Sequence, residues 1–277
     1  MSEPYIAVKQ SCILGESPVW SVAEQALYWV DIRNPMIYRL DPASGDVRNW
    51  RVQTEIGSIG LAGEGRLIAG TRMGIAYIGL DDNSFEELAD PEGDGRMNAV
   101  RMNDGKVDRQ GRFWCGGMDD PGYAEVASLY RFDHDHSIHR MAGPVTISNA
   151  LCWSPDNTIM YFADSRKRTM WAYDFDAVSG AIENRRVFLE VADGEGVPGG
   201  FRARTRRRLA FCRRNGCYRP AGTRLRRLNA PCPTAPRPSF DPGSRDGLFH
   251  PLGCRVPYPV RRVGRCGATR ETAGRIA

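Results

Sequence analysis

The chain has 277 residues, 42% of them hydrophobic and 26% charged, which is enough for a globular protein with a sizeable core. No apolar run is long enough to cross a bilayer, and residues 1–15 lack the basic start and apolar centre of a secretion signal, so we expect a cytoplasmic protein without a membrane partner. The net charge of +5 averages two unlike pieces: residues 1–198 hold 19 basic and 30 acidic residues, and residues 199–277 hold 19 arginines and 3 acidic residues.

Short β-strands are predicted along the first piece. Residues 26–30 (Ala-Leu-Tyr-Trp-Val) and 158–162 (Thr-Ile-Met-Tyr-Phe) are rich in aromatic and branched side chains, and turn-forming residues bound them closely. Related patterns cover residues 103–133 and, more weakly, residues 59–77. No segment shows sustained helical periodicity.

Two of these stretches are copies of one unit. Glu16 begins the first copy and Asn149, 133 positions later, begins the second. Further pairs at the same offset are Trp20 and Trp153, Tyr28 and Tyr161, and Asp31 and Asp164. Repeats of this kind stack around an axis, so equivalent positions converge on it. There, a carboxylate and a carboxamide oxygen could share a hard divalent cation.

The repeat defines the expected fold class. A spacing of about 45 residues with about four short strands per unit matches the blades of a β-propeller. We therefore predict an all-β, propeller-type domain over residues 1–198, with a generic β-sandwich as the alternative. The tryptophans of the repeat are expected in the blade core.

Residues 199–277 lack this blade pattern. They hold five of the eight cysteines and nine of the eighteen prolines, and every basic residue in them is arginine. This composition is typical of a GC-rich coding sequence read out of frame, so we interpret the tail as frameshifted near Gly199 and not natively folded. A nucleic-acid patch, a zinc site and a natural basic tail are alternatives. The arginines match no recognition fold and the cysteines no paired zinc spacing, so no nucleic-acid partner is expected.

Four separated motifs carry a family resemblance. They are residues 16–20 (Glu-Ser-Pro-Val-Trp), 101–108 (Arg-Met-Asn-Asp-Gly-Lys-Val-Asp), 148–156 (Ser-Asn-Ala-Leu-Cys-Trp-Ser-Pro-Asp) and 184–188 (Asn-Arg-Arg-Val-Phe). In this order they resemble the sugar lactone lactonases of the gluconolactonase, senescence marker protein and regucalcin family, over residues 10–198. The resemblance implies a six-bladed β-propeller with one divalent cation at the mouth of the central channel, and here the later blades would be disrupted.

The resemblance also implies roles for individual residues. Glu16 and Asn149 would be metal ligands, and Arg101 and Asn103 would contact the sugar lactone. Glu125 lies in the loop where family members can offer another substrate contact. Read without the resemblance, Asn103 belongs to an Asn-Asp-Gly tight turn.

The third metal ligand of the family is an aspartate in a Pro-Asp-Gly turn, which also handles the attacking water. This chain reads Val-Pro-Gly-Gly over residues 197–200, so Gly199 stands where that aspartate is expected and the catalytic residue is unknown. The nearest acidic residues are Asp193 and Glu195. Histidines 134, 136 and 139 alternate, but they follow a strand pattern, which favours a turn over a metal site.

The chemistry follows from the ligands. A cation held by few protein oxygens polarises a lactone carbonyl and lowers the pKa of its water. The expected function is metal-dependent hydrolysis of a sugar lactone to its aldonic acid, impaired by the missing aspartate. The alternative is a non-catalytic, calcium-binding protein of the regucalcin type, or an inactive product of a frameshifted gene. The sequence does not distinguish Ca, Zn, Mg, Mn or Fe, and it defines neither the sugar nor the oligomeric state.

Overall fold

The fold is all-β, as predicted. The computed structural model describes residues 8–63, 65–93, 99–120, 122–192 and 197–199, together with the backbone of residues 201–205, 208–213 and 216–217. Every regular element in these residues is a strand. The described part of the chain contains no helix that is long and apolar enough to span a membrane.

Four antiparallel four-stranded sheets follow one another along the chain, and a three-stranded sheet comes after them. Blade 1 contains β1 (Gly15–Ser21), β2 (Ala26–Asp31), β3 (Met36–Leu40) and β4 (Val47–Arg51). Blade 2 contains β5 (Ile56–Leu61), β6 (Arg66–Thr71), β7 (Gly74–Gly79) and β8 (Phe85–Ala89). Blade 3 contains β9 (Val100–Val107), β10 (Phe113–Asp119), β11 (Ala127–Phe132) and β12 (Ile138–Val145). Blade 4 contains β13 (Ser148–Trp153), β14 (Ile159–Asp164), β15 (Thr169–Phe175) and β16 (Ile182–Glu190). The last sheet contains β17 (Phe201–Thr205), β18 (Arg208–Arg213) and β19 (Gly216–Cys217).

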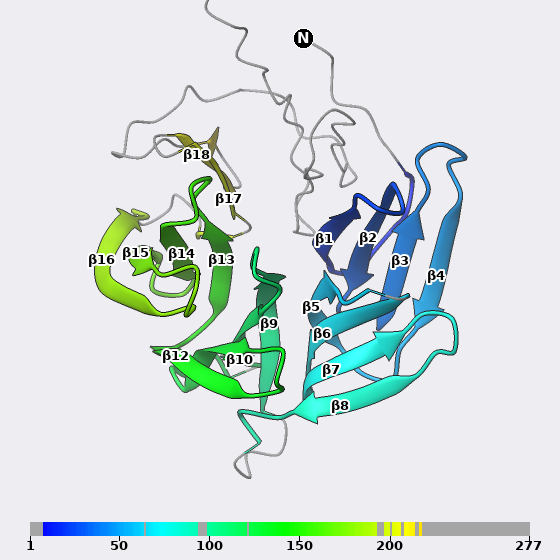
Figure 1. Cartoon of the computed structure of the whole chain (residues 1–277), viewed down its shortest axis with the longest axis horizontal. Helices are drawn as coiled ribbons and strands as arrows, with labels where there is room; N and C mark the ends of the chain where they lie inside the picture. The colour runs from blue at the N-terminus through cyan, green and yellow to red at the C-terminus, as the bar shows by residue number, and fades with distance from the viewer. Residues whose placement is uncertain are drawn as a thin grey trace, which may run out of the picture.

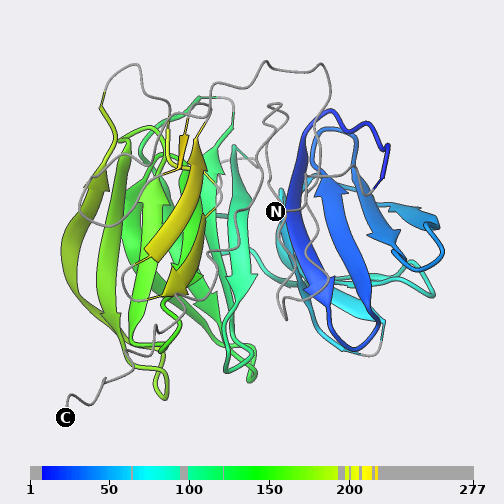
Figure 2. The same ribbon diagram turned by 90° about the horizontal axis from the view of Figure 1, so that it is seen from above.

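The sheets are arranged around a central axis. The first strands of the four blades contact one another in order, and β13 contacts β17 in turn. In Figure 1, β1, β5, β9 and β13 face the middle, whereas β4, β8, β12 and β16 lie at the periphery. Seen from above in Figure 2, the strands run from one face of this arrangement to the other. This is the propeller arrangement that the repeat predicts, and β17–β19 extend it into the range where the sequence shows no blade pattern.

The core lies between neighbouring blades. Trp114 of blade 3 is fully buried and belongs to one hydrophobic cluster with Phe162 and Trp171 of blade 4. A second cluster joins blades 1 and 2 in the same way. Each blade presents an apolar face to its neighbour, because side chains of a strand alternate between the two faces of a sheet. The predicted core role of the tryptophans is confirmed for Trp29, Trp114 and Trp171. Trp20 is partly buried against a third cluster, which contains Trp29, and Trp153 is partly buried against the cluster that contains Trp114.

The repeat is reproduced at the level of hydrogen bonds. Asp31 accepts backbone N–H bonds of 2.7 and 2.9 Å from residues 13–14. Asp164 accepts the equivalent bonds of 2.7 and 3.2 Å from residues 146–147. Both carboxylates are buried, and each satisfies the amides of the segment that leads into the first strand of its blade. The two aspartates therefore have a structural role.

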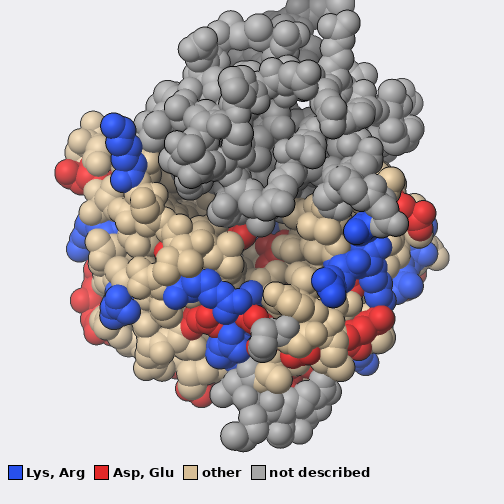
Figure 3. All heavy atoms as spheres, turned by 180° about the vertical axis from the view of Figure 1, so that it is seen from behind, with Lys and Arg blue, Asp and Glu red and all other residues tan. Residues whose placement is uncertain are grey.

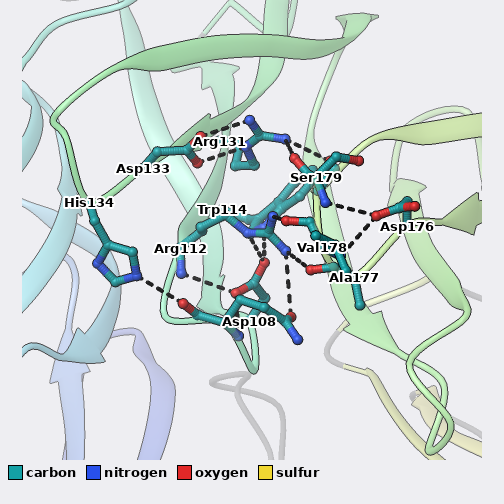
Figure 4. Close-up of polar contacts among 12 residues, drawn as sticks. Asp108, Arg112, Trp114, Arg131, Asp133, His134, Asp176, Ala177, Val178 and Ser179 are labelled. Carbon is teal, nitrogen blue, oxygen red and sulfur yellow. Dashed lines mark hydrogen bonds and ion pairs between the residues drawn. The ribbon is translucent and has the colours of Figure 1, made fainter.

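A second repeated feature lies at the opposite end of the blades. Asp41 and Asp176 open identical turns, in which Gly45 and Gly180 each donate a 2.8 Å backbone bond to the aspartate carbonyl. Arginine side chains of blade 3 cover the blade 4 turn, as Figure 4 shows, whereas the space beside Gly45 in the blade 1 turn is open.

Four guanidinium hydrogen bonds tie this turn to blade 3. Arg112 donates to the carbonyls of Ala177 and Val178 at 2.9 and 3.2 Å. Arg131 donates to the carbonyls of Ser179 and Gly180 at 2.9 and 2.8 Å. Because hydrogen bonds from charged donors are stronger than neutral ones, these contacts fix how blade 4 sits on blade 3.

The two turns provide a matched test of this contact. Gly180→Ala should destabilise the protein by about 3 kcal/mol or more, because a methyl group there would meet the guanidinium nitrogens of Arg112 and Arg131 at 2.4 and 2.5 Å. Gly45→Ala has a similar positive φ, 81° against 71°, but open space around it, so it should cost only about 1–2 kcal/mol. Urea unfolding of both variants measures the difference, and equal losses would show that the arginine contacts contribute little.

Candidate functional site

The candidate site is built from bulges in the inner strands. In blade 1 the pairing of β1 with β2 shifts directly after Glu16, and in blade 4 the pairing of β13 with β14 shifts directly after Asn149. The residues that follow, Ser17 and Ala150, have positive φ angles of 50° and 62°. A bulge redirects the side chains around it, so the same local distortion presents Glu16 and Asn149 equivalently. The positional match predicted from the repeat is confirmed.

Blade 3 carries the same bulge with different residues. In β9 the register shift falls between Met102 and Gly105, so Met102 occupies the position of Glu16. Its neighbours Arg101 and Asn103 are the predicted substrate contacts. In this bulge Asn103 and Asp104 lie opposite the single residue Gly116, so the Asn-Asp-Gly sequence lies within a strand and does not form an isolated tight turn.

The inner strands of neighbouring blades contact one another near these bulges. The Ser17 hydroxyl accepts a 2.8 Å bond from the backbone N–H of Ile59 in blade 2. Gly57 comes so close to β9 that a methyl group there would lie 2.3 Å from the Met102 carbonyl oxygen. Asn103 donates from Nδ2 to the Ser148 carbonyl oxygen in blade 4 at 2.8 Å. The bulges thus form one end of the ring, which we call the upstream rim because β1, β5, β9 and β13 begin there.

Glu16 is placed in an environment that disfavours its charge. Removal from water and repulsion by Asp104 raise the pKa of Glu16 to about 8, although attraction by Arg101 partly opposes the shift. Burial likewise raises the pKa of Asp104. Two carboxylates that repel each other at a partly buried site are stabilised by a shared cation, because it supplies the missing opposite charge.

Asp104 is the functional candidate that sequence reasoning missed. Its Oδ2 atom accepts a 3.0 Å bond from the backbone N–H of Leu151, two residues beyond Asn149. The aspartate of blade 3 therefore lies against the bulge that carries Asn149. Its place in an Asn-Asp-Gly sequence suggested a turn, and only the bulge register shows that it belongs to the rim.

Asn149 is held by a hydrogen-bond relay that ends at Pro198, the residue before Gly199. Its Nδ2 atom donates to the Ser165 hydroxyl at 2.8 Å, and this hydroxyl donates to the Pro198 carbonyl oxygen at 2.5 Å. Because the amide nitrogen is engaged, the carboxamide oxygen is oriented away from this bond and remains the natural atom for a cation. Pro198 and Gly199 are both buried. Asn149 is thus linked, through Ser165, to the residue that precedes the position of the expected aspartate.

Arg101 and Asn103 are brought together. Arg101 is buried and donates from Nη1 to the Asn103 Oδ1 atom at 2.9 Å and to the Met102 carbonyl oxygen at 3.1 Å. Its Nε atom donates to Asp120 at 2.7 Å. On the face seen in Figure 3, acidic atoms lie in a central hollow and basic side chains lie on both sides of it.

Other predicted candidates lie apart from this group. Glu125 is exposed and forms an ion pair with Lys167, so it connects two rim loops of blades 3 and 4. The histidines lie in and around the turn between β11 and β12, where His134 bonds the Gln110 carbonyl oxygen at 2.8 Å and His139 bonds the Ser137 hydroxyl at 3.0 Å. Asp193 and Glu195 lie outside the described residues.

The donors at the rim fit a hard divalent cation. Glu16 and Asp104 offer carboxylate oxygens and Asn149 a carboxamide oxygen, which is the all-oxygen chemistry that Ca²⁺ and Mg²⁺ prefer. No group of three or more histidine, cysteine, aspartate or glutamate side chains suited to a metal occurs in the described part of the chain. A cation here would therefore depend on the carboxamide as well as on the two acids.

Taken together, the fold and the rim define a β-propeller with an oxygen-donor site at one end of its axis. The model of the SMP-30/Gluconolactonase/LRE-like region matches residues 14–246. The chain therefore belongs to the SMP-30/gluconolactonase family, as its motifs predict. The match runs beyond residue 198, into the range that we interpret as frameshifted.

Two relatives illustrate the range of this family. The 6-deoxy-6-sulfogluconolactonase of Pseudomonas putida is 38% identical over 190 residues, which cover 68% of this chain and 64% of that protein. The regucalcin of Xenopus laevis is 35% identical over 198 residues, which cover 70% and 66%. The chain thus spans about two thirds of the length of the relatives that it matches.

Solved structures support the fold. A calcium-binding protein, the regucalcin of Agrobacterium tumefaciens, superposes with a TM-score of 0.74 at 20% identity, covering 82% of this chain and 77% of that one. The β-propeller domain of Cps50 (Swd1) from Myceliophthora thermophila superposes with a TM-score of 0.57 at 11% identity, covering 81% and 75%. At these identities the likeness concerns the fold alone.

Cation binding provides a test of the rim residues. Glu16→Gln and Asn149→Ala should each weaken the binding of a divalent cation on the order of tenfold or more, because each removes an oxygen ligand from a small donor set. Titration calorimetry with Ca²⁺, Mg²⁺, Mn²⁺ and Zn²⁺ measures the effect. Glu125→Gln is the matched control, since Glu125 pairs with Lys167. Unchanged binding in both rim variants would remove these residues from the site.

The raised pKa of Glu16 has a consequence for stability. In the metal-free folded protein the pKa of Glu16 is about 8, whereas in the unfolded chain it is near 4.5. Between these values the folded state binds more protons, so stability should fall as pH rises from about 4.5 to 8. Glu16→Gln should flatten this dependence by about 1 kcal/mol or more. Urea unfolding in a chelator at pH 5, 7 and 8.5 tests the difference, and parallel profiles would place Glu16 in a solvated environment.

Proposed function

We propose that this chain derives from a metal-dependent lactonase that hydrolyses a sugar lactone to its aldonic acid, and that the chain as written is impaired. The observation that supports this function most directly is the upstream rim, where Glu16, Asp104 and Asn149 gather oxygen donors beside Arg101 and Asn103. The names of the relatives agree with this chemistry. A small-molecule sugar lactone is the proposed substrate.

In this proposal the rim residues have different roles. Glu16, Asp104 and Asn149 would hold a divalent cation, which when bound supplies Lewis acidity toward a carbonyl and lowers the pKa of a coordinated water. Arg101 would donate to the oxygen that becomes negative as the ring ester is attacked. Asn103 can both donate and accept, so it can orient a ring hydroxyl. Burial strengthens each of these contacts because water screens them less.

The proposed impairment concerns proton transfer. The family's aspartate would accept a proton from the attacking water, and Gly199 has no side chain to do so. The relay from Asn149 through Ser165 to Pro198 supports the position, since it connects Gly199 to the rim. Losing a general base typically costs about 10²–10⁴-fold in rate.

The second candidate function is cation binding without turnover. It is favoured by Gly199, because the acidic donors can attract a cation even where no base is available. A calcium-binding protein of the regucalcin type, or an inactive product of a frameshifted gene, fits this description. The two functions differ in one measurable property, which is the rate at which a lactone opens in the presence of the bound ion.

Hydrolysis assays at constant pH provide the test. With gluconolactone, galactonolactone, arabinonolactone and xylonolactone, the chain should open the ring little faster than the uncatalysed reaction, with or without added divalent cation. Gly199→Asp alone should not restore activity, because residues 199–277 lack the blade pattern that would orient the new carboxylate. A chain with the downstream reading frame restored should be active. A competent lactonase as written would contradict the Gly199 argument and direct attention to Asp104 as the base.

A further inference from the structure

An ion-pair network lies directly behind Arg101. Asp120 follows β10 and is 6% exposed. Besides the 2.7 Å bond from Arg101 Nε, its carboxylate accepts bonds from Arg33 at 2.9 and 3.0 Å and from Arg72 at 3.3 Å. Three guanidinium groups from three blades thus meet at one carboxylate.

Glu55 completes the network. It begins the approach to β5 and accepts a 2.8 Å bond from Arg33, and it also forms an ion pair with Arg72. Burial alone would raise the pKa of Asp120, but hydrogen bonds from Arg33 and Arg101 outweigh this effect and lower it to about 2. Asp120 is therefore ionised at every pH at which the protein is expected to work.

We propose that Asp120 is a positioning residue that fixes the guanidinium of Arg101 for the substrate, and that Arg33 and Arg72 fix Asp120 in turn. This proposal rests on the proposed function, in which Arg101 contacts the sugar lactone.

The geometry explains why a partner is needed. Arg101 uses Nη1 to bind its own strand and Asn103, and these two bonds alone leave the guanidinium free to pivot about Nη1. The bond from Nε to Asp120 adds a second point of attachment, which sets the plane of the group. Because Arg33 comes from blade 1 and Arg72 from blade 2, this plane depends on the relative placement of three blades. The orientation of the bound substrate would then depend on how the blades pack against one another.

A matched pair of aspartates allows a sharp test. Asp108 lies on the same blade, at the opposite end, and accepts a 2.7 Å bond from Arg112 Nε, as Asp120 does from Arg101 Nε. Asp120→Asn and Asp108→Asn therefore make the same chemical change to the same kind of pair. Arg33→Gln is a milder variant, since the Arg33 side chain is 38% exposed and its loss leaves the bond from Asp120 to Arg101 in place.

Two measurements read out the position of Arg101. The first is its ¹⁵Nε–¹Hε resonance, assigned by its absence in Arg101→Lys, which reports the hydrogen bond without any ligand. The second is the affinity for aldonate products such as gluconate and galactonate, which requires no turnover. Asp120→Asn should abolish slow solvent exchange of the Arg101 Nε proton and weaken aldonate binding about tenfold or more. Arg33→Gln should change both in the same direction by less, and Asp108→Asn should lower only the melting temperature.

Each possible result either supports the proposal or contradicts it. An Arg101 resonance that is unchanged in both Asp120→Asn and Arg33→Gln would overturn it, as would equal losses of aldonate affinity in Asp120→Asn and Asp108→Asn. If the unsubstituted chain binds none of the aldonates, the proposed function fails by itself, and the resonance alone then decides whether Asp120 positions Arg101. If Asp120→Asn does not fold, the resonance and affinity of Arg33→Gln decide in its place.

Discussion

The bulge near the beginning of the inner strands is the constraint on which the rest of the rim depends. A regular strand would point successive side chains to opposite faces of its blade, into the packing between blades. The bulge interrupts this alternation, and in blades 1 and 4 it does so directly after Glu16 and Asn149. The same distortion in blade 3 brings Asp104 against the blade 4 bulge. Polar residues from separate sheets therefore lie at the same end of the ring, because each of these sheets is distorted in the same place.

Placing several charged groups together at this rim costs free energy, and ion pairs offset this cost for some of the groups only. Asp120 and Glu55 are matched by arginines, so their charges are stable in spite of burial. Glu16 and Asp104 have no such match, and both pKa values are raised. A pair of acids with raised pKa values beside a network of ion pairs is an arrangement typical of a functional site. In the proposed site, the network would supply rigidity and the acid pair would bind the cation.

Contacts between blades at one end of the ring mainly stabilise the fold, whereas those at the other end involve the candidate site. At the end of the ring opposite the upstream rim, Arg112 and Arg131 bond the carbonyls of the blade 4 turn and hold two blades together, and each also forms an ion pair within blade 3, with Asp108 and Asp133 respectively. At the upstream rim, the contacts between blades run through the same residues that form the candidate site. Changes in blade packing at that end therefore reach the site directly, whereas changes at the other end act mainly on stability.

The sequence by itself determined the repeating unit, the strand-rich blades and the equivalence of Glu16 and Asn149. These features depend on local periodicity and on the constant spacing between matching residues of the two copies, and both can be read from the sequence. It also marked Arg101 and Asn103 through their motif. The tertiary structure alone decided that Asp104 belongs to the rim, since only the one-residue register shift in β9 shows that Asp104 lies in a bulge and not in a tight turn. It likewise decided that Asp120 supports Arg101, because the partners Arg33, Glu55 and Arg72 come from blades 1 and 2, and no local pattern relates residues so far apart in the chain.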